Sequence, residues 1–527
     1  MPSETLFGEA QENRRRRPKR KSAPVFKQYA SNEQLMLPPN VEELIPDHHL
    51  VRVVNRTIDN MHVAELLQRQ YKGGGASAYL PTMMIKLIIY AYVSKVYSSR
   101  QIAKAVRQDI TFMWLAGMSR PDFRTINNFR SGVLKPVIQD VFTAMIMFLI
   151  AQKYVDLQHY FVDGTKMRAD ANRYTPVWRK NTKRHKEQVQ KKIKEHLDYI
   201  DSITELENRD YGDRDLEELG DHTTITSEDI KREAEKIRKR VQERLPSKRA
   251  QRVERKLTHS LLPKLEKYEQ QERLLGNRNS YSRTDPAATF FRTASGELLP
   301  MYNVLMGTQR QFVLHYSIHQ KASETDQFTK HMTQAFACWD RYPGAIVGDS
   351  TYGSEDNYRF LETHGIGNYL KYPMFHAPKP KLYSKDQFIY DANSDSFRCP
   401  AGRSLPLKTV RSMTTPAGAP TTMRQYMCTD CSNCPLSTKC KRAVGLRTVT
   451  INPEAEAYRE QARINLESEA GIALRVRRST DVEPTFGDIK GNNEYRRFRL
   501  RGLEKVNIEF GLISMAHNMK KLALTAS

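Results

Sequence analysis

The sequence lacks an apolar run long enough to cross a bilayer. A membrane-spanning helix needs about 20 apolar residues, and the longest runs, which begin at Met83 and Val141, are shorter. We therefore expect both to be buried helices. The basic run from Arg14 to Lys21 has no apolar segment behind it, so it is not a secretory signal. These features predict a cytoplasmic chain without a membrane partner.

Several catalytic motifs are also absent. The chain contains no GxxxxGK[ST] phosphate loop and no HExxH helix, so neither ATP use nor zinc proteolysis has support. None of the 14 histidines stands in a serine or cysteine context typical of covalent catalysis.

Acidic residues are fewer than basic residues. The chain has 60 Asp and Glu against 84 Lys and Arg, a formal net charge of +24. This balance suits a polyanionic partner, and nucleic acid is the first candidate. With 527 residues, the chain is also too long for one ordinary core, so we expect three or more structural units.

Cysteine is scarce outside one segment. Five of the six cysteines form the array Cys399, then Cys428-x2-Cys431-x2-Cys434-x5-Cys440. In a reducing compartment such a cluster favours metal over disulfides. Four thiolates suit structural Zn²⁺, an iron–sulfur cluster is the alternative, and some thiols could be free. Either metal would brace a small insertion with little core of its own, and the spacing does not say which four cysteines bind.

Periodicity divides the chain into segments of different character. The N-terminal part reads as a basic mobile arm followed by an all-α domain. In that domain a helix-turn-helix would direct Arg124, Asn127, Asn128 and Arg130 to DNA, although mere helix packing explains the pattern equally well. The boundaries that we expect are a basic arm at 1–40, a helical DNA-binding domain at 41–154, parts of a catalytic core at 155–180, 281–395 and 450–527, a charged helical insertion at 181–280 and a cysteine-rich insertion at 396–449.

The segments after residue 154 suggest an α/β layout. Alternating residues predict a buried strand that runs into a hairpin, with Asp163 at the end of its first apolar run. Asp349 follows another apolar run, and Glu483 is expected at the start of a helix. The charged segment 181–280 has narrow apolar seams typical of a helical hairpin. That hairpin could clamp DNA, support dimerisation or be merely solvated.

Carboxylates in such positions suit phosphoryl transfer on DNA. That reaction uses two hard cations, one at the attacking oxygen and one at the leaving oxygen. Magnesium prefers oxygen ligands, so two or three acids from different elements are sufficient.

Three blocks of sequence resemble the catalytic blocks of bacterial insertion-sequence DDE transposases, in the same order: FVDGTKMRADANRYTPVWRK, GDSTYGSEDNY and VEPTFGDIKGNNEYRRFRLRGLEKV. Residues 41–154 are similar to the InsH-type N-terminal transposase domain, with its SSRxIAxAxR and PDFxTINxFR signatures. The resemblance implies an RNase H-like α/β core and makes Asp163, Asp349 and Glu483 the catalytic acids. These acids would hold two Mg²⁺ or Mn²⁺ ions.

Such transposases also carry a Tyr, an Arg and a Lys around the third acid. Lys490 follows Glu483 at a spacing of two helical turns, so it would hold a phosphate on the same face. Arg478 supplies the arginine, whereas Arg475 stands where the tyrosine is expected. Four arginines beyond this point would line DNA or form a solvated basic face: Arg496, Arg497, Arg499 and Arg501. For Asp285 and Asp326 we expect turn or cap roles.

The resemblance implies a DNA transposase that cuts double-stranded DNA at terminal inverted repeats and joins it to target DNA. A homodimer or larger synaptic complex is expected, because paired ends must react. The alternatives are a nuclease without strand transfer and a non-catalytic DNA-binding regulator.

Overall fold

The computed structural model describes residues 40–71, 78–211, 226–228, 231, 248–373, 375, 383–441 and 444–526. The basic arm predicted for 1–40 therefore lies, except for Asn40, outside the described residues. The chain divides into two compact units, Met1–Leu44 and Ile45–Ser527. In the first, the described part ends in a 3-10 turn, η1, at Val41–Leu44. All other elements belong to the second unit.

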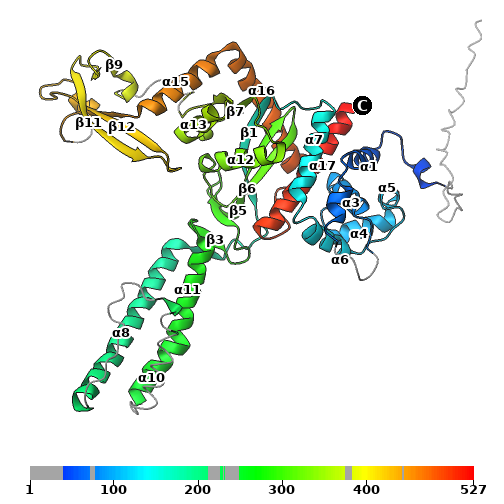
Figure 1. The fold of residues 1–527 in the computed structure, drawn as a ribbon, viewed down its shortest axis with the longest axis horizontal. Coiled ribbons are helices and arrows are strands. Elements are labelled where there is room, and N and C mark those ends of the chain that lie inside the picture. Colours follow the sequence, from blue (N-terminus) through cyan, green and yellow to red (C-terminus); the bar gives the residue numbers. More distant parts are fainter. Residues whose placement is uncertain are drawn as a thin grey trace, which may run out of the picture. The chain divides into compact units, whose positions relative to one another are not determined.

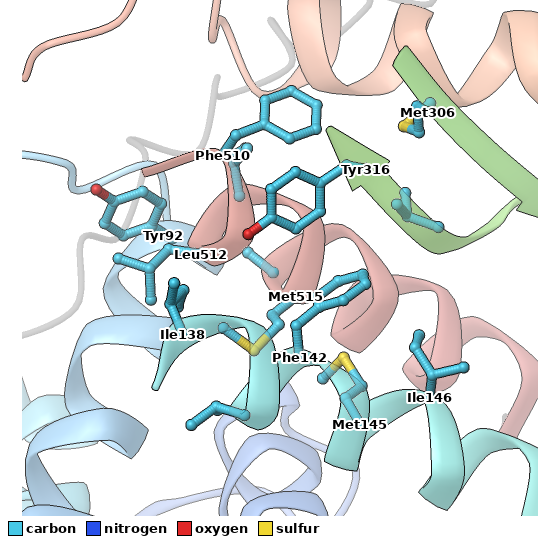
Figure 2. Packing of buried hydrophobic residues seen from close by; sticks show 14 of the residues in the cluster. Tyr92, Ile138, Phe142, Met145, Ile146, Met306, Tyr316, Phe510, Leu512 and Met515 are labelled. Atoms are coloured by element: carbon cyan, nitrogen blue, oxygen red, sulfur yellow. The ribbon is translucent and has the colours of Figure 1, made fainter. Parts of the chain in front are cut away.

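The second unit begins with helices. They are α1 (Leu50–Asn60), α2 (Ala64–Gln68), α3 (Pro81–Val93), α4 (Ser99–Gln108), α5 (Ile110–Leu115), α6 (Phe123–Asn128) and α7 (Ile138–Ala151). The two apolar runs of the sequence form α3 and α7, and as predicted both are core helices, with ten of 13 residues buried in α3 and six of 14 in α7. Figure 2 shows Phe142 and Met145 of α7 packed against Met515 of the last helix and near Tyr316.

No single helix in the described part of the chain is long and apolar enough to cross a membrane. One bent pair, Phe123–Val133 with Ile138–Ala151, passes the test of length and composition only when its two helices are taken together.

A six-stranded mixed sheet forms the centre of the unit. Its strands are β1 (His159–Arg168), β4 (Thr289–Arg292), β5 (Leu298–Gln309), β6 (Phe312–His319), β7 (Ala345–Gly348) and β8 (Gly367–Leu370). They follow the order β4-β5-β1-β7-β8, and β6 also pairs with β5. The β4, β5, β6 and β1 pairings are antiparallel, whereas β7 runs parallel to both β1 and β8.

The hairpin predicted after Asp163 is wrong. Strand β1 continues through Asp163 to Arg168 and pairs with the distant β5, while the short β2 (Pro176–Trp178) pairs with β3 (Ser280–Ser282). Alternation identifies a strand and its buried face, but it carries no information about which distant segment supplies the partner.

Helices cover the sheet. They are α12 (Phe328–Trp339), α13 (Glu355–Thr363), α15 (Pro453–Glu467), α16 (Glu469–Gly487) and α17 (Leu503–Ala526), with a π-helical turn, η8, at Asp488–Asn492. Helix α16 contacts β1, β5 and β7, and α17 contacts β6, α3 and α7 (Figure 1). The C-terminal helices thus join the N-terminal helices and the sheet in one apolar core, and the fold is mixed α/β, as predicted.

A pair of long helical segments lies between β2 and β3. Helix α8 (Arg179–Tyr211) runs beside α10 (Lys248–Lys256), η4 (Leu257–Leu261) and α11 (Leu262–Leu275) (Figure 1). Six buried side chains form the seam between them: Val189, Ile193, Leu197, Leu257, Leu261 and Leu265. The other seam positions that the sequence suggested, Ile230, Ala234, Ile237, Val241 and Leu245, lie outside the described residues.

The cysteine-rich segment has more structure than we expected. Five antiparallel strands, ordered β13-β12-β11-β10-β9, make a second sheet. They are β9 (Ile389–Asp391), β10 (Ser396–Arg398), β11 (Ser404–Thr414), β12 (Pro420–Met427) and β13 (Thr448–Ile451). Phe388, Phe397, Leu405, Tyr426 and Val449 form an apolar cluster with Cys428. The core of this segment is small, as expected, and is made by apolar residues far apart in the segment that meet across the sheet.

Candidate active site

Two of the three predicted acids lie at the same level of adjacent strands, Asp163 within β1 and Asp349 directly after β7. In the parallel pair β1 and β7, Phe161 is in register with Val347. Asp163 and Asp349 each stand two residues beyond this pair, so their backbones are neighbours. Asp163 lies within β1, opposite Met306, and not at the end of a strand. Asp349 follows β7, and its carboxylate accepts hydrogen bonds from the Thr351 amide (2.9 Å) and hydroxyl (3.2 Å).

The third acid comes from α16. Glu483 lies near the C-terminal end of this helix, so the expectation that it begins a helix is wrong. The helix already begins at Glu469, because Ser468 caps its first turn by accepting the Gly471 amide at 3.0 Å. The Glu483 side chain is 60% exposed, and α16 contacts both β1 and β7.

Arg478 connects the first and third acids. Its Nη2 lies 3.0 Å from Asp163 Oδ2, and its Nη1 lies 3.6 Å from Glu483 Oε1. Burial raises the pKa of Asp163, and the Arg478 guanidinium opposes this shift. Repulsion from Asp349 and Glu483 raises the same pKa further. The three carboxylates are therefore close enough to repel one another, and Arg478 partly neutralises them.

The end of α16 is fixed to the turn between β5 and β6. The buried Asp481 carboxylate accepts hydrogen bonds from the Thr308 hydroxyl (2.7 Å) and the amides of Arg310 (2.7 Å) and Gln311 (3.1 Å). Pro484 has no N–H to donate to the carbonyl of Thr480. The side-chain amide of Gln311 donates to that carbonyl instead, at 2.8 Å. Both anchors lie within one helical turn before Glu483, so they fix the part of α16 that carries it.

Lys490 reaches the same region from η8. Its Nζ donates to the Thr165 hydroxyl and, at 3.4 Å, to the carbonyl of Lys166, so it lies along β1 close beyond Asp163. Burial lowers the pKa of Lys490, and the Asp163 charge opposes this effect. The helix changes to a π-helical turn before Lys490, so the two residues do not share the regular helix from which their common face was inferred.

The turn that carries Lys490 is held by Asp488. The Asp488 carboxylate accepts hydrogen bonds from the His517 ring (2.7 Å) and from the side-chain amides of Asn492 (3.1 Å) and Asn493 (2.9 Å). The His517 bond above all, with the Asn492 bond and the nearby Lys520 charge, lowers the pKa of Asp488 to about 2 against the opposing effect of burial. Helix α17 thereby positions the turn next to the acids.

A fourth carboxylate, which the sequence analysis missed, lies at the site. Burial raises the pKa of Glu324; the Tyr352 hydroxyl, which donates to Oε2 at 3.0 Å, lowers it, and repulsion from Asp163 and Asp349 raises it. The only sequence signal was its place two residues before Asp326. Asp326 itself is exposed in the turn η5 (Thr325–Gln327).

Two further basic residues, Lys371 and Arg475, lie near the acids. Burial lowers the pKa of Lys371, which follows β8, and the positive charges of Arg478 and Arg475 lower it further. Arg475, which stands where the resemblance leads us to expect a tyrosine, lies over the ring of Phe375, 5.1 Å from its centroid.

Some candidate DNA contacts are engaged within the protein. Arg130 was expected to face DNA, but it is only 5% exposed and donates to the carbonyl of Tyr97 (3.0 Å) and to the hydroxyl of Ser99 (3.1 Å). That prediction is wrong, because α6 and η2 (Phe129–Val133) turn this side chain into the helical core. Arg124 and Asn127 are exposed.

Beyond Lys490, the arginines also have partners. Arg497 and Arg501 both pair with Asp170, Arg501 at 2.9 Å, and Arg496 donates to the carbonyl of Lys490 at 3.2 Å. Asp285 is fully buried and accepts from Tyr302 (2.8 Å) and from the amide of Gly502 (3.1 Å). Its carboxylate also accepts the amide of Ala287, two residues on, at 3.3 Å, which is the turn contact that we predicted.

The clustered cysteines surround one small cavity. All five line a space of about 20 Å³: Cys399, Cys428, Cys431, Cys434 and Cys440. Burial raises the pKa of Cys428 to about 11 and also raises that of Cys440. No group of three or more His, Cys, Asp or Glu side chains within the described residues is arranged to hold a metal ion as it stands. This holds for the cysteines and for the acids.

Two family models match the chain. The Transposase DDE domain matches residues 398–523, a range that includes Glu483 and the cysteines but neither Asp163 nor Asp349. The Transposase domain DUF772 matches residues 39–132. No curated protein matches the chain. Both matches are transposase domains, and together they support an insertion-sequence DDE transposase.

Proposed function

We propose that this transposase cuts the DNA at the ends of its element and joins those ends to target DNA at a site formed by Asp163, Asp349 and Glu483. The observation that carries the proposal is that Asp163 and Asp349 each stand two residues beyond Phe161 and Val347, which are paired on the parallel strands β1 and β7. The link from Asp163 to Glu483 through Arg478 adds to it. The sheet, antiparallel on one side of β1 and parallel on the other, is consistent with an RNase H-like core.

The donor set fits hard divalent cations. Carboxylate oxygens are the ligands that Mg²⁺ and Mn²⁺ prefer, and the mutual repulsion of these carboxylates is relieved when positive charge lies between them. Asp163, Asp349 and Glu483 would hold two ions, which when bound would activate the attacking oxygen and stabilise the leaving oxygen. The Arg478 guanidinium lies where a cation would bind Asp163. It would therefore leave Asp163 when a cation binds.

The basic residues of the site suit a phosphate backbone. Arg478, released from Asp163, and Lys490, which lies beside β1, would bind the phosphate that is cut. The exposed Arg124 and Asn127 on α6 would contact the inverted repeats, and Arg496 and Arg497 would bind DNA beyond Lys490. The net charge of +24 would add attraction that does not depend on DNA sequence.

The two DNA ends of the element must react together, so we propose a dimer or larger complex on DNA. The paired helices α8 and α10–α11 are available for a contact between subunits or with DNA.

Cleavage and joining of DNA that carries the element's ends test the function. The wild type, Asp163→Asn, Asp349→Asn and Glu483→Gln would be compared in Mg²⁺, with the exposed Asp326→Asn as the matched control. We expect the three site variants to bind DNA but lose both reactions, and the control to keep them. Cleavage without joining by the wild type would favour a nuclease, and binding alone a regulator.

A further inference from the structure

Glu324 lies directly against the strand that carries Asp163. It precedes η5, in the connection between β6 and α12, and its carboxylate rests on Gly164, the residue after Asp163. A Cβ built on Gly164 would lie 2.1 Å from Glu324 Oε2 and 2.3 Å from its Cδ. Such distances are far shorter than van der Waals contact, so this approach requires glycine at position 164.

The turn that carries Glu324 is bonded to the turn that carries Asp349. The Tyr352 hydroxyl donates to Glu324 Oε2 at 3.0 Å, and the Thr325 hydroxyl donates to the carbonyl of Thr351 at 2.6 Å. The side-chain amide of Asn357 donates to the carbonyls of both Tyr352 (2.9 Å) and Thr325 (3.3 Å). The two turns thus form one unit, which holds Glu324 and Asp349 in fixed positions beside β1.

Glu324 has no cationic partner at ion-pair distance among the described residues, whereas Asp163 is paired with Arg478. The Lys166 charge attracts this carboxylate from beyond ion-pair distance, but repulsion from Asp163 and Asp349 acts on it more strongly. A partly buried carboxylate is unfavourable in such surroundings. The hydroxyl of Tyr352 orients the carboxylate but brings no positive charge. A bound cation would supply it.

We propose that Glu324 is a fourth carboxylate ligand of the divalent ions, together with Asp163, Asp349 and Glu483. This inference rests on the proposed function. It assigns Gly164 the role of admitting the carboxylate to β1, and Tyr352 the role of orienting it.

Binding of Mn²⁺ to the full-length protein without DNA tests the inference. The free ion would be measured by electron paramagnetic resonance for the wild type, Asp163→Asn, Glu324→Gln, Tyr352→Phe and the control Asp326→Asn. We expect Glu324→Gln to weaken Mn²⁺ affinity about tenfold or more and Tyr352→Phe to have a smaller effect. The control should bind as the wild type does. Without metal, Glu324→Gln should unfold at the same temperature as the wild type or higher, because glutamine keeps an acceptor for Tyr352 and removes a repelling charge.

Gly164→Ala provides a second variant that leaves the Glu324 side chain itself intact. Its Cβ should displace the carboxylate and weaken Mn²⁺ binding, with little further loss in the Gly164→Ala, Glu324→Gln double variant. If Glu324→Gln binds Mn²⁺ as the wild type does while Asp163→Asn has lost binding, Glu324 is not a ligand and the inference is overturned. If Asp163→Asn also binds normally, the proposed metal site itself is wrong.

Discussion

Arg478 Nη2 lies 3.0 Å from Asp163 Oδ2, so the guanidinium supplies positive charge among acids that repel Asp163. Arginine and a divalent cation therefore compete for the same carboxylate. In this arrangement the acids remain close together without metal, and the arginine becomes available for a phosphate once a cation is bound.

Replacement of this arginine should make stability depend on metal. We expect Arg478→Gln to lower the free energy of unfolding without metal by about 1–3 kcal/mol, because Asp163 is left partly buried and unpaired. Added Mn²⁺ should stabilise the variant more than it stabilises the wild type. Thermal unfolding with and without Mn²⁺ would measure both effects. Arg463→Gln, which removes only exposed ion pairs on α15, is the control, and equal metal stabilisation in all three proteins would contradict the competition.

Asp481 anchors the helix that carries Glu483, and its removal should affect both stability and activity. Asp481→Ala leaves three donors without their acceptor, so we expect a loss of about 2–4 kcal/mol in urea unfolding. At a temperature where the variant is still folded, DNA cleavage should fall while DNA binding persists. Gln311→Ala, which removes the bond to the Thr480 carbonyl, should have a smaller effect in the same direction. Full cleavage by Asp481→Ala would show that Glu483 needs no such anchor.

The Asp488 pair with His517 should make stability depend on acid pH. The folded pKa of Asp488 is about 2, against an ordinary value of 3.8, so its contribution is present above pH 4 and is lost as the pH falls through 2. After allowance for partial solvent screening, we expect about 1–2 kcal/mol. Asp488→Asn should therefore be less stable than the wild type at pH 7, and the difference should shrink between pH 4 and pH 2. Denaturant unfolding at several pH values measures it, with Asp326→Asn as the control, and a difference independent of pH would exclude this linkage.

The cysteine cluster should retain a metal ion. Backbone amides donate to two of its sulfurs, from Arg403 to Cys399 (3.3 Å) and from Arg447 to Cys431 (3.4 Å), and such bonds stabilise thiolates. We propose that Zn²⁺ binds there and draws four sulfurs into a tetrahedral set. Metal analysis of the purified protein should find about one zinc per chain.

The control for that measurement is the sixth cysteine. Cys431→Ser should lose the zinc and lower the melting temperature, whereas Cys338→Ser, outside the cluster, should retain it. Visible absorption with bound iron would favour the iron–sulfur alternative, and a stable protein without metal would leave free thiols.

The sequence predicted secondary structure and burial where the pattern of apolar residues within one segment is sufficient to indicate them. The apolar runs predicted the buried helices α3 and α7. The apolar run before Asp349 predicted the strand β7. In each of these cases, burial of one face follows from residues that are adjacent in the chain.

Other features depend on partners far away in the chain. Arg130 is a residue type that often contacts DNA, yet it is buried here because the Tyr97 carbonyl, before α4, and the Ser99 hydroxyl of α4 accept its hydrogen bonds. Glu324 was overlooked because nothing near it in the sequence shows that Gly164 lies beneath it. The position of Glu483 near the end of α16 depends on where Ser468 caps that helix.

By itself, the sequence determined the basic charge, the helical and strand-forming segments and the three acids as candidates. Only the tertiary structure decided that β1 pairs with β5 and β7, that Asp163 and Asp349 stand level, and that Arg478 and Glu324 adjoin them. The physical reason is that side-chain periodicity specifies which face of an element is buried. The choice of the covering element comes from packing among segments more than a hundred residues apart.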